Sequence, residues 1–145
     1  MKVVLENIRS AQNVGSIIRT CDAFGIRDIY FCGITPTPEN KKVLKTSLGA
    51  EKNINTHYKI STTQALSELK KDNELIALEI TQNAIDIKKF KSEKNIVIVL
   101  GNEISGISDQ SLSLCDKVLK IPMKGTKESL NVAVAFGIAA FELSQ

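Results

Sequence analysis

Short apolar runs separated by helical patterns are the feature that most constrains the fold of this chain. Five runs of strand length recur, and the fourth, Ile96–Leu100, is apolar and rich in β-branched residues. Strands that are covered on both faces of a parallel sheet have this composition, whereas a half-solvated strand alternates apolar and polar residues. The other four runs are Val3–Leu5, Ile29–Phe31, Leu75–Leu78 and Val118–Ile121.

Helical patterns lie between these runs. We expect helices at Ala11–Phe24, Thr62–Lys70, Ile85–Phe90, Asp109–Leu114 and Ser129–Leu143. The alternation of strands and helices predicts an α/β fold in which a mostly parallel sheet is sandwiched by helices. The segment 36–56 is long, polar and contains lysines, which is typical of a mobile functional loop.

Length and composition favour one ordinary globular domain over residues 1–145. Hydrophobic residues make up 43% of the 145 residues, and no apolar run reaches the length of a membrane span. The N-terminus turns polar too early for a signal peptide, so we expect a cytoplasmic protein without membrane contact.

Three cysteines without C-x-x-C spacing indicate reduced core thiols; they are Cys21, Cys32 and Cys115. The single histidine, His57, is expected in a surface loop. We therefore expect no metal site.

Lysines are clustered, although the net charge is only +3. Such clusters are either solvated surfaces or phosphate contacts, and the charge permits an anionic partner without requiring one. The clusters are Lys41, Lys42 and Lys45; Lys88, Lys89, Lys91 and Lys94; and Lys120, Lys124 and Lys127.

The stretch 121–132 has the composition of a binding site. Ser129 and Asn131 stand where a glycine-bearing loop turns into an apolar helix, and the N–H groups at a helix start can hold polar ligand atoms. In parallel sheets, ligands bind beyond the carboxyl ends of the strands, which is where this stretch falls. An apolar surface for a flat ring is offered by Ile121, Met123 and Leu130.

Two further segments carry polar residues with two interpretations each. Gly101-x-Glu103-x-x-Gly106 matches neither a dinucleotide fingerprint nor a phosphate loop. It is either a simple strand-to-helix turn or a close backbone approach to a ligand, with Glu103 pairing a cation or hydroxyl. Arg19 flanks the apolar stripe of its helix. It either reaches water or Asp22, or binds a phosphate or sugar oxygen with its planar guanidinium.

Taken together, three ordered segments closely resemble the motifs of SpoU/TrmH-type RNA ribose methyltransferases of the SPOUT superfamily. The first is Asn13-x-Gly15-x-x-x-Arg19-Thr20 with Ala23-Phe24-Gly25, the second is Gly101-Asn102-Glu103-x-x-Gly106, and the third is Ile121-Pro122-Met123 with Ser129-Leu130-Asn131-Val132. The resemblance spans nearly the whole chain.

The resemblance implies transfer of a methyl group from S-adenosylmethionine to a ribose 2′-hydroxyl of tRNA or rRNA. It makes Arg19 the catalytic arginine, has Asn13 orient the nucleotide, and places Glu103, Ser129 and Asn131 in the polar site. An arginine side chain stays protonated in proteins and is therefore a poor base. We expect Arg19 to stabilise a developing alkoxide or to clamp a phosphate.

The resemblance also implies features that general rules do not predict. The C-terminal part would form a trefoil knot, against the usual topology of proteins, and the chain would form a homodimer in which Arg19 lies near the partner's cofactor site. The bent cofactor would touch Leu78, Glu79, Leu100, Gly101, Ile121, Met123 and Leu130.

We expect no separate RNA-binding domain, so recruitment of RNA falls to the dimer surface and to loops such as Lys41–Lys52, or to a partner. The RNA-binding residues that we expect are Arg19, Lys41, Lys42 and Lys45. Two rival functions remain at this point. One is a non-catalytic RNA-binding or dimerisation module on the same fold. The other is a flavodoxin-like nucleotide binder, which should show a phosphate loop after the first strand, where this chain has Asn7-Ile8-Arg9-Ser10.

Overall fold

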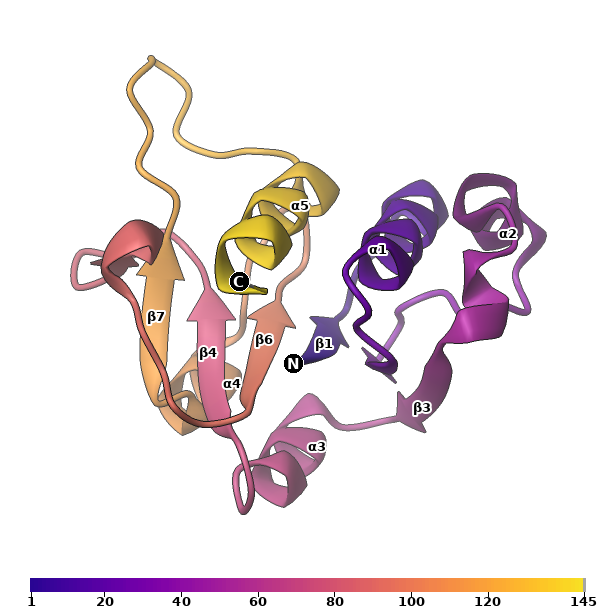
Figure 1. The fold of residues 1–145 in the computed structure, drawn as a ribbon, viewed down its shortest axis with the longest axis horizontal. Coiled ribbons are helices and arrows are strands. Elements are labelled where there is room, and N and C mark those ends of the chain that lie inside the picture. Colours follow the sequence, from indigo (N-terminus) through magenta and orange to yellow (C-terminus); the bar gives the residue numbers. More distant parts are fainter. Residues whose placement is uncertain (145) are drawn as a thin grey trace.

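A single parallel sheet runs through the computed structural model, which describes residues 1–144 (Figure 1). Within those residues the sheet has seven strands in the order β3-β2-β1-β6-β4-β7-β5, and every neighbouring pair is parallel. The strands are β1 (Lys2–Glu6), β2 (Asp28–Cys32), β3 (Asn55–Lys59), β4 (Glu74–Leu78), β5 (Ile85–Asp86), β6 (Ile96–Leu100) and β7 (Lys117–Lys120). The predicted α/β class is confirmed.

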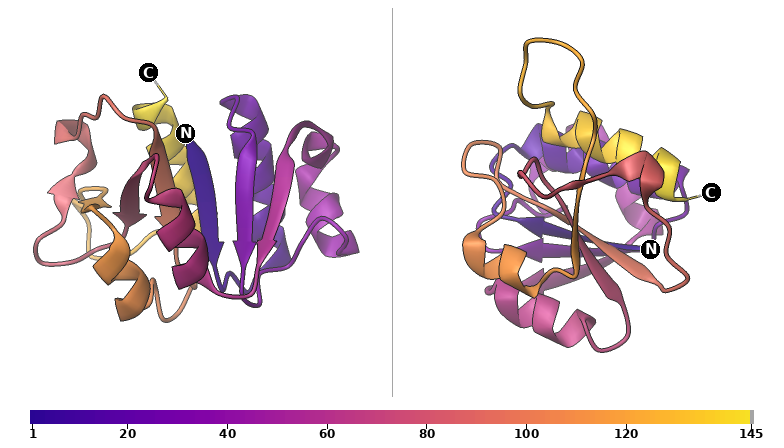
Figure 2. Two further views of the ribbon diagram at one scale, coloured as in Figure 1. Left: turned by 90° about the horizontal axis from the view of Figure 1, so that it is seen from below. Right: turned by 90° about the vertical axis from the view of Figure 1, so that its left-hand side faces the viewer.

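Helices cover both faces of the sheet, as the right-hand view of Figure 2 shows. One layer holds α1 (Ala11–Ala23), α2 (Lys41–Ser47) and α5 (Val132–Leu143), with α1 in contact with both of the others. The opposite layer holds α3 (Thr62–Leu69) and α4 (Asp109–Leu114). Two short 3-10 helices, η1 (Ala50–Asn53) and η2 (Ile87–Lys89), lie in connections.

The central strand β6 explains why the sheet needs both layers. All five of its residues are buried. Ile96, Ile98 and Leu100 belong to the core beneath α1 and α5, whereas Val97 and Val99 belong to the core beneath α3. Because successive side chains of a strand point to opposite faces, an uninterrupted apolar run requires cover on both sides. The sequence prediction for this strand is confirmed.

The segment 36–56 and His57 are not the loop that the sequence predicted. This stretch contains α2, η1 and the start of β3. The sequence pattern of these elements is weak because α2 buries only Val43 and Ser47, and because β3 is an edge strand paired on one side only. His57 lies in β3, where its Nε2 is 2.8 Å from Asp28 Oδ1 and its ring stacks on Tyr30.

Two of the predicted helices also differ from the structure. The helix expected at Ile85–Phe90 is the two-residue strand β5 followed by η2, because Asp86 Oδ1 caps a single tight turn by accepting from the N–H of Lys88. The last helix begins at Val132 rather than at Ser129, because the Asn131 side chain caps it.

The three cysteines are free thiols within residues 1–144. Cys21 and Cys32 are buried and Cys115 is partly buried; burial raises the pKa of Cys32 to about 11 and that of Cys115 to about 12. In the same part of the chain, no helix has the length and apolar character to cross a bilayer. Nor do three or more His, Cys, Asp or Glu side chains there gather as a potential metal site.

A close contact at Gly15 joins α1 to α2. A Cβ atom there would overlap the Thr46 hydroxyl oxygen and the carbonyl oxygen of Val43. The Thr46 hydroxyl lies 3.2 Å from that same oxygen and 3.3 Å from the carbonyl oxygen of Gln12 on α1. The absence of a side chain at Gly15 therefore sets the distance between the two helices.

Replacing Gly15 with alanine should destabilise the protein by about 1–3 kcal/mol, because the added methyl group overpacks a backbone contact. Gly137→Ala is the matched control, since Gly137 also lies within a helix and has open space around its Cβ position. Alanine there should raise stability by roughly 0.5–1 kcal/mol through helix propensity. Urea denaturation of both variants measures the difference, and equal effects would contradict the proposed contact.

Candidate active site

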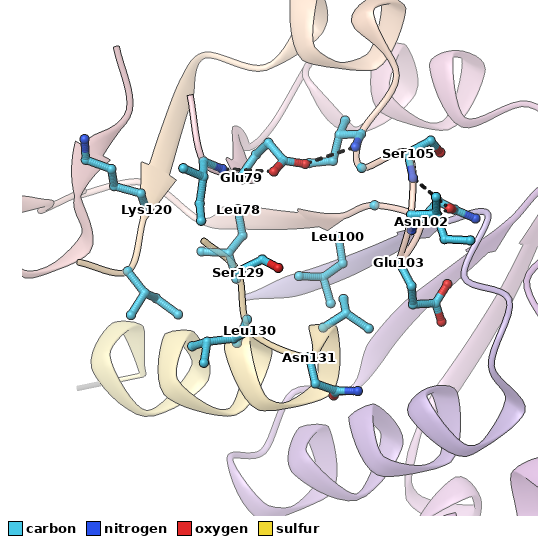
Figure 3. Close-up of a pocket in the computed structure, with 18 of the residues that line it drawn as sticks. Leu78, Glu79, Leu100, Asn102, Glu103, Ser105, Lys120, Ser129, Leu130 and Asn131 are labelled. Atoms are coloured by element: carbon cyan, nitrogen blue, oxygen red, sulfur yellow. Dashed lines mark hydrogen bonds between the residues drawn. The ribbon is translucent and has the colours of Figure 1, made fainter. Parts of the chain in front are cut away.

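A cavity of about 470 Å³ opens at the carboxyl ends of β4, β6 and β7 (Figure 3). Three segments line it: residues 78–80 after β4, residues 100–107 after β6, and parts of residues 119–135 between the end of β7 and the first turn of α5. The last segment includes the long loop that projects beyond the sheet in Figure 1. This volume and position are typical of sites for small organic ligands in parallel sheets.

The structure brings together most of the residues that the sequence singled out. All seven predicted cofactor contacts line the cavity, and so do three of the five predicted catalytic residues, Glu103, Ser129 and Asn131. Ser129 is exposed, and Figure 3 shows its hydroxyl directed towards Leu100. Apolar lining is supplied by Leu78, Leu100, Ile121, Met123 and Leu130. The cavity thus combines an apolar wall for a ring with polar groups at one side.

Residues 101–107 form a closed loop that presents Glu103. The backbone of Asn102 and Gly106 exchanges two hydrogen bonds of 3.1 and 2.9 Å, and the Asn102 side chain accepts from the N–H groups of Ile104 and Ser105. A Cβ atom at Gly101 would overlap the backbone of Gly106, so only glycine allows the chain to fold back this closely. This segment is therefore a loop closed by its own hydrogen bonds, and not the simple strand-to-helix turn considered from sequence.

The Glu103 carboxylate binds the start of α1. It accepts hydrogen bonds from the backbone N–H of Arg9 at 2.9 Å, from that of Ser10 at 3.0 Å and from the Asn13 amide at 3.0 Å. Burial acts to raise the pKa of the Glu103 carboxyl, but these donors outweigh it and hold the pKa below its usual value. The carboxylate therefore stays ionised and engaged at neutral pH.

This arrangement bears on the flavodoxin-like alternative. In such folds the N–H groups after the first strand bind the phosphate of a nucleotide, because a helix start favours an anion. Here the N–H groups of Arg9 and Ser10 already hold a carboxylate of the same chain. The expected phosphate site is thus filled by Glu103.

Two asparagines extend the network to the last helix. Asn13 donates to Glu103 and accepts, through its Oδ1, a hydrogen bond of 3.0 Å from the Asn131 amide. Asn131 in turn accepts through its own Oδ1 from the N–H groups of Ala133 and Val134, which caps α5. Each amide thus has a donor and an acceptor partner that fix its orientation. Glu103, Asn13 and Asn131, hereafter the polar relay, join three segments that are far apart in the sequence.

Two other carboxylates hold the far wall of the cavity. Glu79 accepts from the N–H of Ile80 at 2.9 Å and from that of Ile107 at 3.2 Å, and a Cβ atom at Gly106 would meet its carboxylate. Glu6, which is only 4% exposed, accepts from the backbone N–H and hydroxyl of Ser108 and from the hydroxyl of Ser111. Sequence reasoning missed Glu6; a charged residue that ends an apolar strand was the available signal.

Arg19 and the three predicted RNA-binding lysines lie elsewhere. Arg19 is exposed on α1, does not line the cavity, and makes no hydrogen bond or ion pair within residues 1–144. The alternative partner Asp22 instead lies 3.7 Å from Arg27. The predicted lysines, Lys41, Lys42 and Lys45, are exposed on α2.

Comparisons with known proteins agree with this geometry. A model of the SpoU rRNA methylase family matches residues 1–141. The tRNA (guanosine(18)-2′-O)-methyltransferase of Thermus thermophilus is 32% identical over 143 residues, which are 98% of this chain and 73% of that protein.

Two solved structures share the fold. The SpoU methyltransferase AviRb from Streptomyces viridochromogenes, in complex with AdoMet, superposes with a TM-score of 0.91 at 25% identity, over 99% of this chain and 59% of that one. The TrmH/SpoU tRNA modifying enzyme of Aquifex aeolicus gives a TM-score of 0.88 at 30% identity, over 99% and 73%. The chain thus spans about three fifths to three quarters of the length of these proteins.

Replacing Glu103 with glutamine should lower the free energy of unfolding at pH 7 by about 0.5–1 kcal/mol, because the hydrogen bonds to three donors lose their charge at a site that is exposed to solvent screening. The folded-state pKa is depressed, so this contribution is complete above the ordinary value of 4.5 and disappears as the pH falls through the folded pKa. The gap between wild type and variant should therefore close towards pH 3, as measured by urea denaturation.

Glu128→Gln is the control for this prediction. Glu128 is exposed in the loop before α5 and makes no hydrogen bond or ion pair among the described residues. Its substitution should leave the stability unchanged at both pH values. A loss in Glu103→Gln that is the same at pH 7 and pH 3 would contradict a contribution from the ionised carboxylate.

Proposed function

Since the chain belongs to the SpoU rRNA methylase family, we propose that it transfers a methyl group from S-adenosylmethionine to a ribose 2′-hydroxyl of tRNA or rRNA. The observation that carries this proposal is the polar relay, which joins the three motif segments beside the cavity, with Glu103 and Asn131 lining it. The name of the Thermus thermophilus relative gives the same reaction on a tRNA guanosine, and the Streptomyces structure is in complex with AdoMet.

The cavity fits this methyl donor in size and in chemistry. Its apolar wall suits the adenine ring, and the backbone groups of the surrounding loops suit the polar edges of the ring. The donor supplies an electrophilic methyl group on a sulfonium. The residues that would hold it are Leu78, Glu79, Leu100, Gly101, Ile121, Met123 and Leu130.

The residues of the polar relay act by positioning. Methyl transfer needs the ribose oxygen in line with the sulfonium methyl, and correct orientation supplies much of the acceleration. The Glu103 carboxylate is a poor proton acceptor, because its pKa is depressed and three donors occupy it. It therefore fixes Asn13 and Asn131, while Ser129 and Asn131 face the ribose. Arg19 stabilises the negative charge that develops on the ribose oxygen or holds the adjacent phosphate.

A homodimer supplies Arg19 to the cavity in this proposal. Arg19 is exposed on α1, outside the cavity of its own chain. Beside α1, helix α5 leaves three large apolar side chains exposed, Val134, Ile138 and Phe141, and Phe141 packs edge-on against Phe24 at the end of α1. A second copy that covers this α1–α5 face would bury the apolar surface and bring Arg19 to the partner's cavity.

We also propose that the C-terminal part passes through the chain as a trefoil knot. In support, β7 lies on the side of β4 that faces away from β6. After β7 the chain returns to place α5 beside α1. Helix α5 also packs against η2, and Ile87 of η2 shares one core cluster with Phe136 of α5. The connection between β4 and β6 thus lies against the returning helix, as threading requires.

A cytoplasmic location completes the proposal, with residues 1–145 acting as one catalytic domain. The free thiols of Cys21, Cys32 and Cys115 are compatible with a reducing compartment. The family model likewise covers the sheet and both helical layers as one unit, residues 1–141.

The reaction is tested with purified protein, S-adenosylmethionine carrying a labelled methyl group, and separate samples of unmodified tRNA and rRNA. We expect label in 2′-O-methylated nucleosides after digestion of one of the two RNA samples. Label on a base would contradict ribose methylation. Binding of RNA without any calorimetric signal for S-adenosylmethionine would support the non-catalytic module instead.

Arg19→Ala should lower the methylation rate about 100-fold or more, because an electrostatic contact to the reacting oxygen is lost. The affinity for S-adenosylhomocysteine, measured by calorimetry, should stay within about twofold, because the proposed contact of Arg19 is with the ribose oxygen or phosphate of the RNA and not with the cofactor. Arg27→Ala is the control: Arg27 is also exposed, but it binds Asp22 and the carbonyl oxygen of Asn53. Activity of Arg19→Ala within a few fold of wild type would exclude the proposed role.

Mixed dimers test whether Arg19 acts across subunits. Arg19→Ala lacks the arginine, and Leu130→Arg puts a cation on the apolar wall of the cavity, so each variant alone should be inactive. After subunit exchange of equal amounts, half of the dimers are mixed and each has one complete site, which gives about a quarter of wild-type activity. No recovery, with exchange verified by mass spectrometry, would place Arg19 at its own chain's cavity.

A further inference from the structure

Helix α2 carries an exposed stripe of mixed character. Lys41, Leu44, Lys45 and Leu48 follow one another at intervals of three, one and three residues, which places them on one face of the helix and its C-cap. All four are exposed, and Leu48 is 68% exposed. Leu44 is 38% exposed, so the two leucines together offer an apolar surface beside two ammonium groups to a binding partner.

Leu48 is held in a conformation that leucine disfavours. Its backbone is left-handed, with φ 51° and ψ 40°, although it is not glycine. A clamp maintains this turn: the Glu51 carboxylate accepts from the hydroxyl of Ser47 at 2.5 Å and from the N–H of Gly49 at 3.1 Å. The Ser47 hydrogen bond also lowers the pKa of Glu51. Ser47 and Ala50 are buried, so the turn presents Leu48 outwards on a fixed support.

Exposed lysines flank Leu48, with the Glu51 carboxylate among them. Lys41, Lys42, Lys45 and Lys52 are exposed and make no ion pair within residues 1–144. Single-stranded nucleic acid presents phosphates that pair with such ammonium groups and unstacked bases that pack against apolar side chains. A lipid surface would favour a longer apolar face than two leucines. The pattern of lysine and leucine therefore fits an unpaired RNA strand.

The stripe is mechanically connected to the candidate active site. The contact at Gly15 fixes α2 against α1, and α1 carries Asn13 of the polar relay as well as Arg19. Arg19 follows Gly15 by one helical turn, about 6 Å along the axis. A strand bound on α2 would thus lie at a fixed distance from the arginine.

We infer that the α2 stripe, Lys41, Leu44, Lys45 and Leu48, binds an unpaired segment of the substrate RNA, with the lysines on phosphates and Leu48 against a base or ribose. This inference rests on the proposed function, because it takes RNA as the substrate. It adds the surface that holds the RNA next to the helix that bears Arg19.

Two variants separate the charged contribution from the apolar one. The double variant Lys41→Gln/Lys45→Gln removes two phosphate contacts, and Leu48→Asn removes the apolar side chain while keeping a residue that tolerates the left-handed conformation. Lys88→Gln/Lys89→Gln on η2 is the matched control, with the same change of charge at two exposed lysines. The probe is unfractionated tRNA, with binding measured by filter retention from low to moderate salt.

The lysine double variant should reduce the slope of log affinity against log salt by about 1.4–1.8, because each phosphate contact contributes about 0.7–0.9. Leu48→Asn should weaken binding about fivefold with the slope unchanged, because it removes a contact without charge. Calorimetry with S-adenosylhomocysteine should give wild-type affinity for all three variants. That affinity shows that the folded cavity is retained.

Three outcomes would overturn the inference. The first is wild-type RNA binding in both α2 variants, and the second is an equal loss of RNA binding in the η2 control. The third is conversion of the dimer to a monomer by Leu48→Asn in light scattering, which would assign the stripe to a subunit contact. In all three, wild-type protein still binds tRNA and cofactor, so the proposed function stands. Failure of the proposed function would appear as wild-type protein that binds neither.

Discussion

The interaction on which the site depends is the binding of one carboxylate at the start of a helix. Glu103 reaches across from the loop after β6 and satisfies the N–H groups of Arg9 and Ser10, which have no partner inside α1. Its remaining bond orients Asn13, and Asn13 orients Asn131. Because Asn131 also caps α5, one anion links the starts of the first and last helices, whose buried side chains share one core cluster.

Close backbone approaches give this carboxylate its position. The loop that carries Glu103 folds back on itself at Gly101, where any Cβ atom would overlap the backbone of Gly106. Glu79 holds the other end of the loop through the N–H of Ile107, and Glu6 holds Ser108 just beyond it. Three carboxylates from three separate segments thus anchor one loop, each by accepting from a backbone N–H group. The cavity wall is consequently stiff on the side that carries the polar relay.

The sequence predicted the buried parts of this protein well and its surface parts poorly. The strand Ile96–Leu100 could be predicted because an apolar run rich in β-branched residues is typical of a strand that is covered on both faces. Strand β3 was missed, since an edge strand with exposed side chains lacks both the apolar run and the alternation. The cavity residues were found through their motifs. The partners of Glu103 were not, because hydrogen bonds between residues 90 or more positions apart leave no local pattern.

The separation of Arg19 from the cavity follows from the same physical constraints. A cavity for a sulfonium ion is better left without a fixed cation, because two like charges in a partly desolvated site repel each other. Within one chain, α1 directs Asn13 towards the polar relay and leaves Arg19 exposed outside the cavity. In the homodimer that we propose, the partner subunit's Arg19 would face the ribose side of the cavity, where negative charge develops during methyl transfer. The cavity of one chain would then hold the methyl donor, and the site that we propose would be complete only with the partner subunit and the RNA.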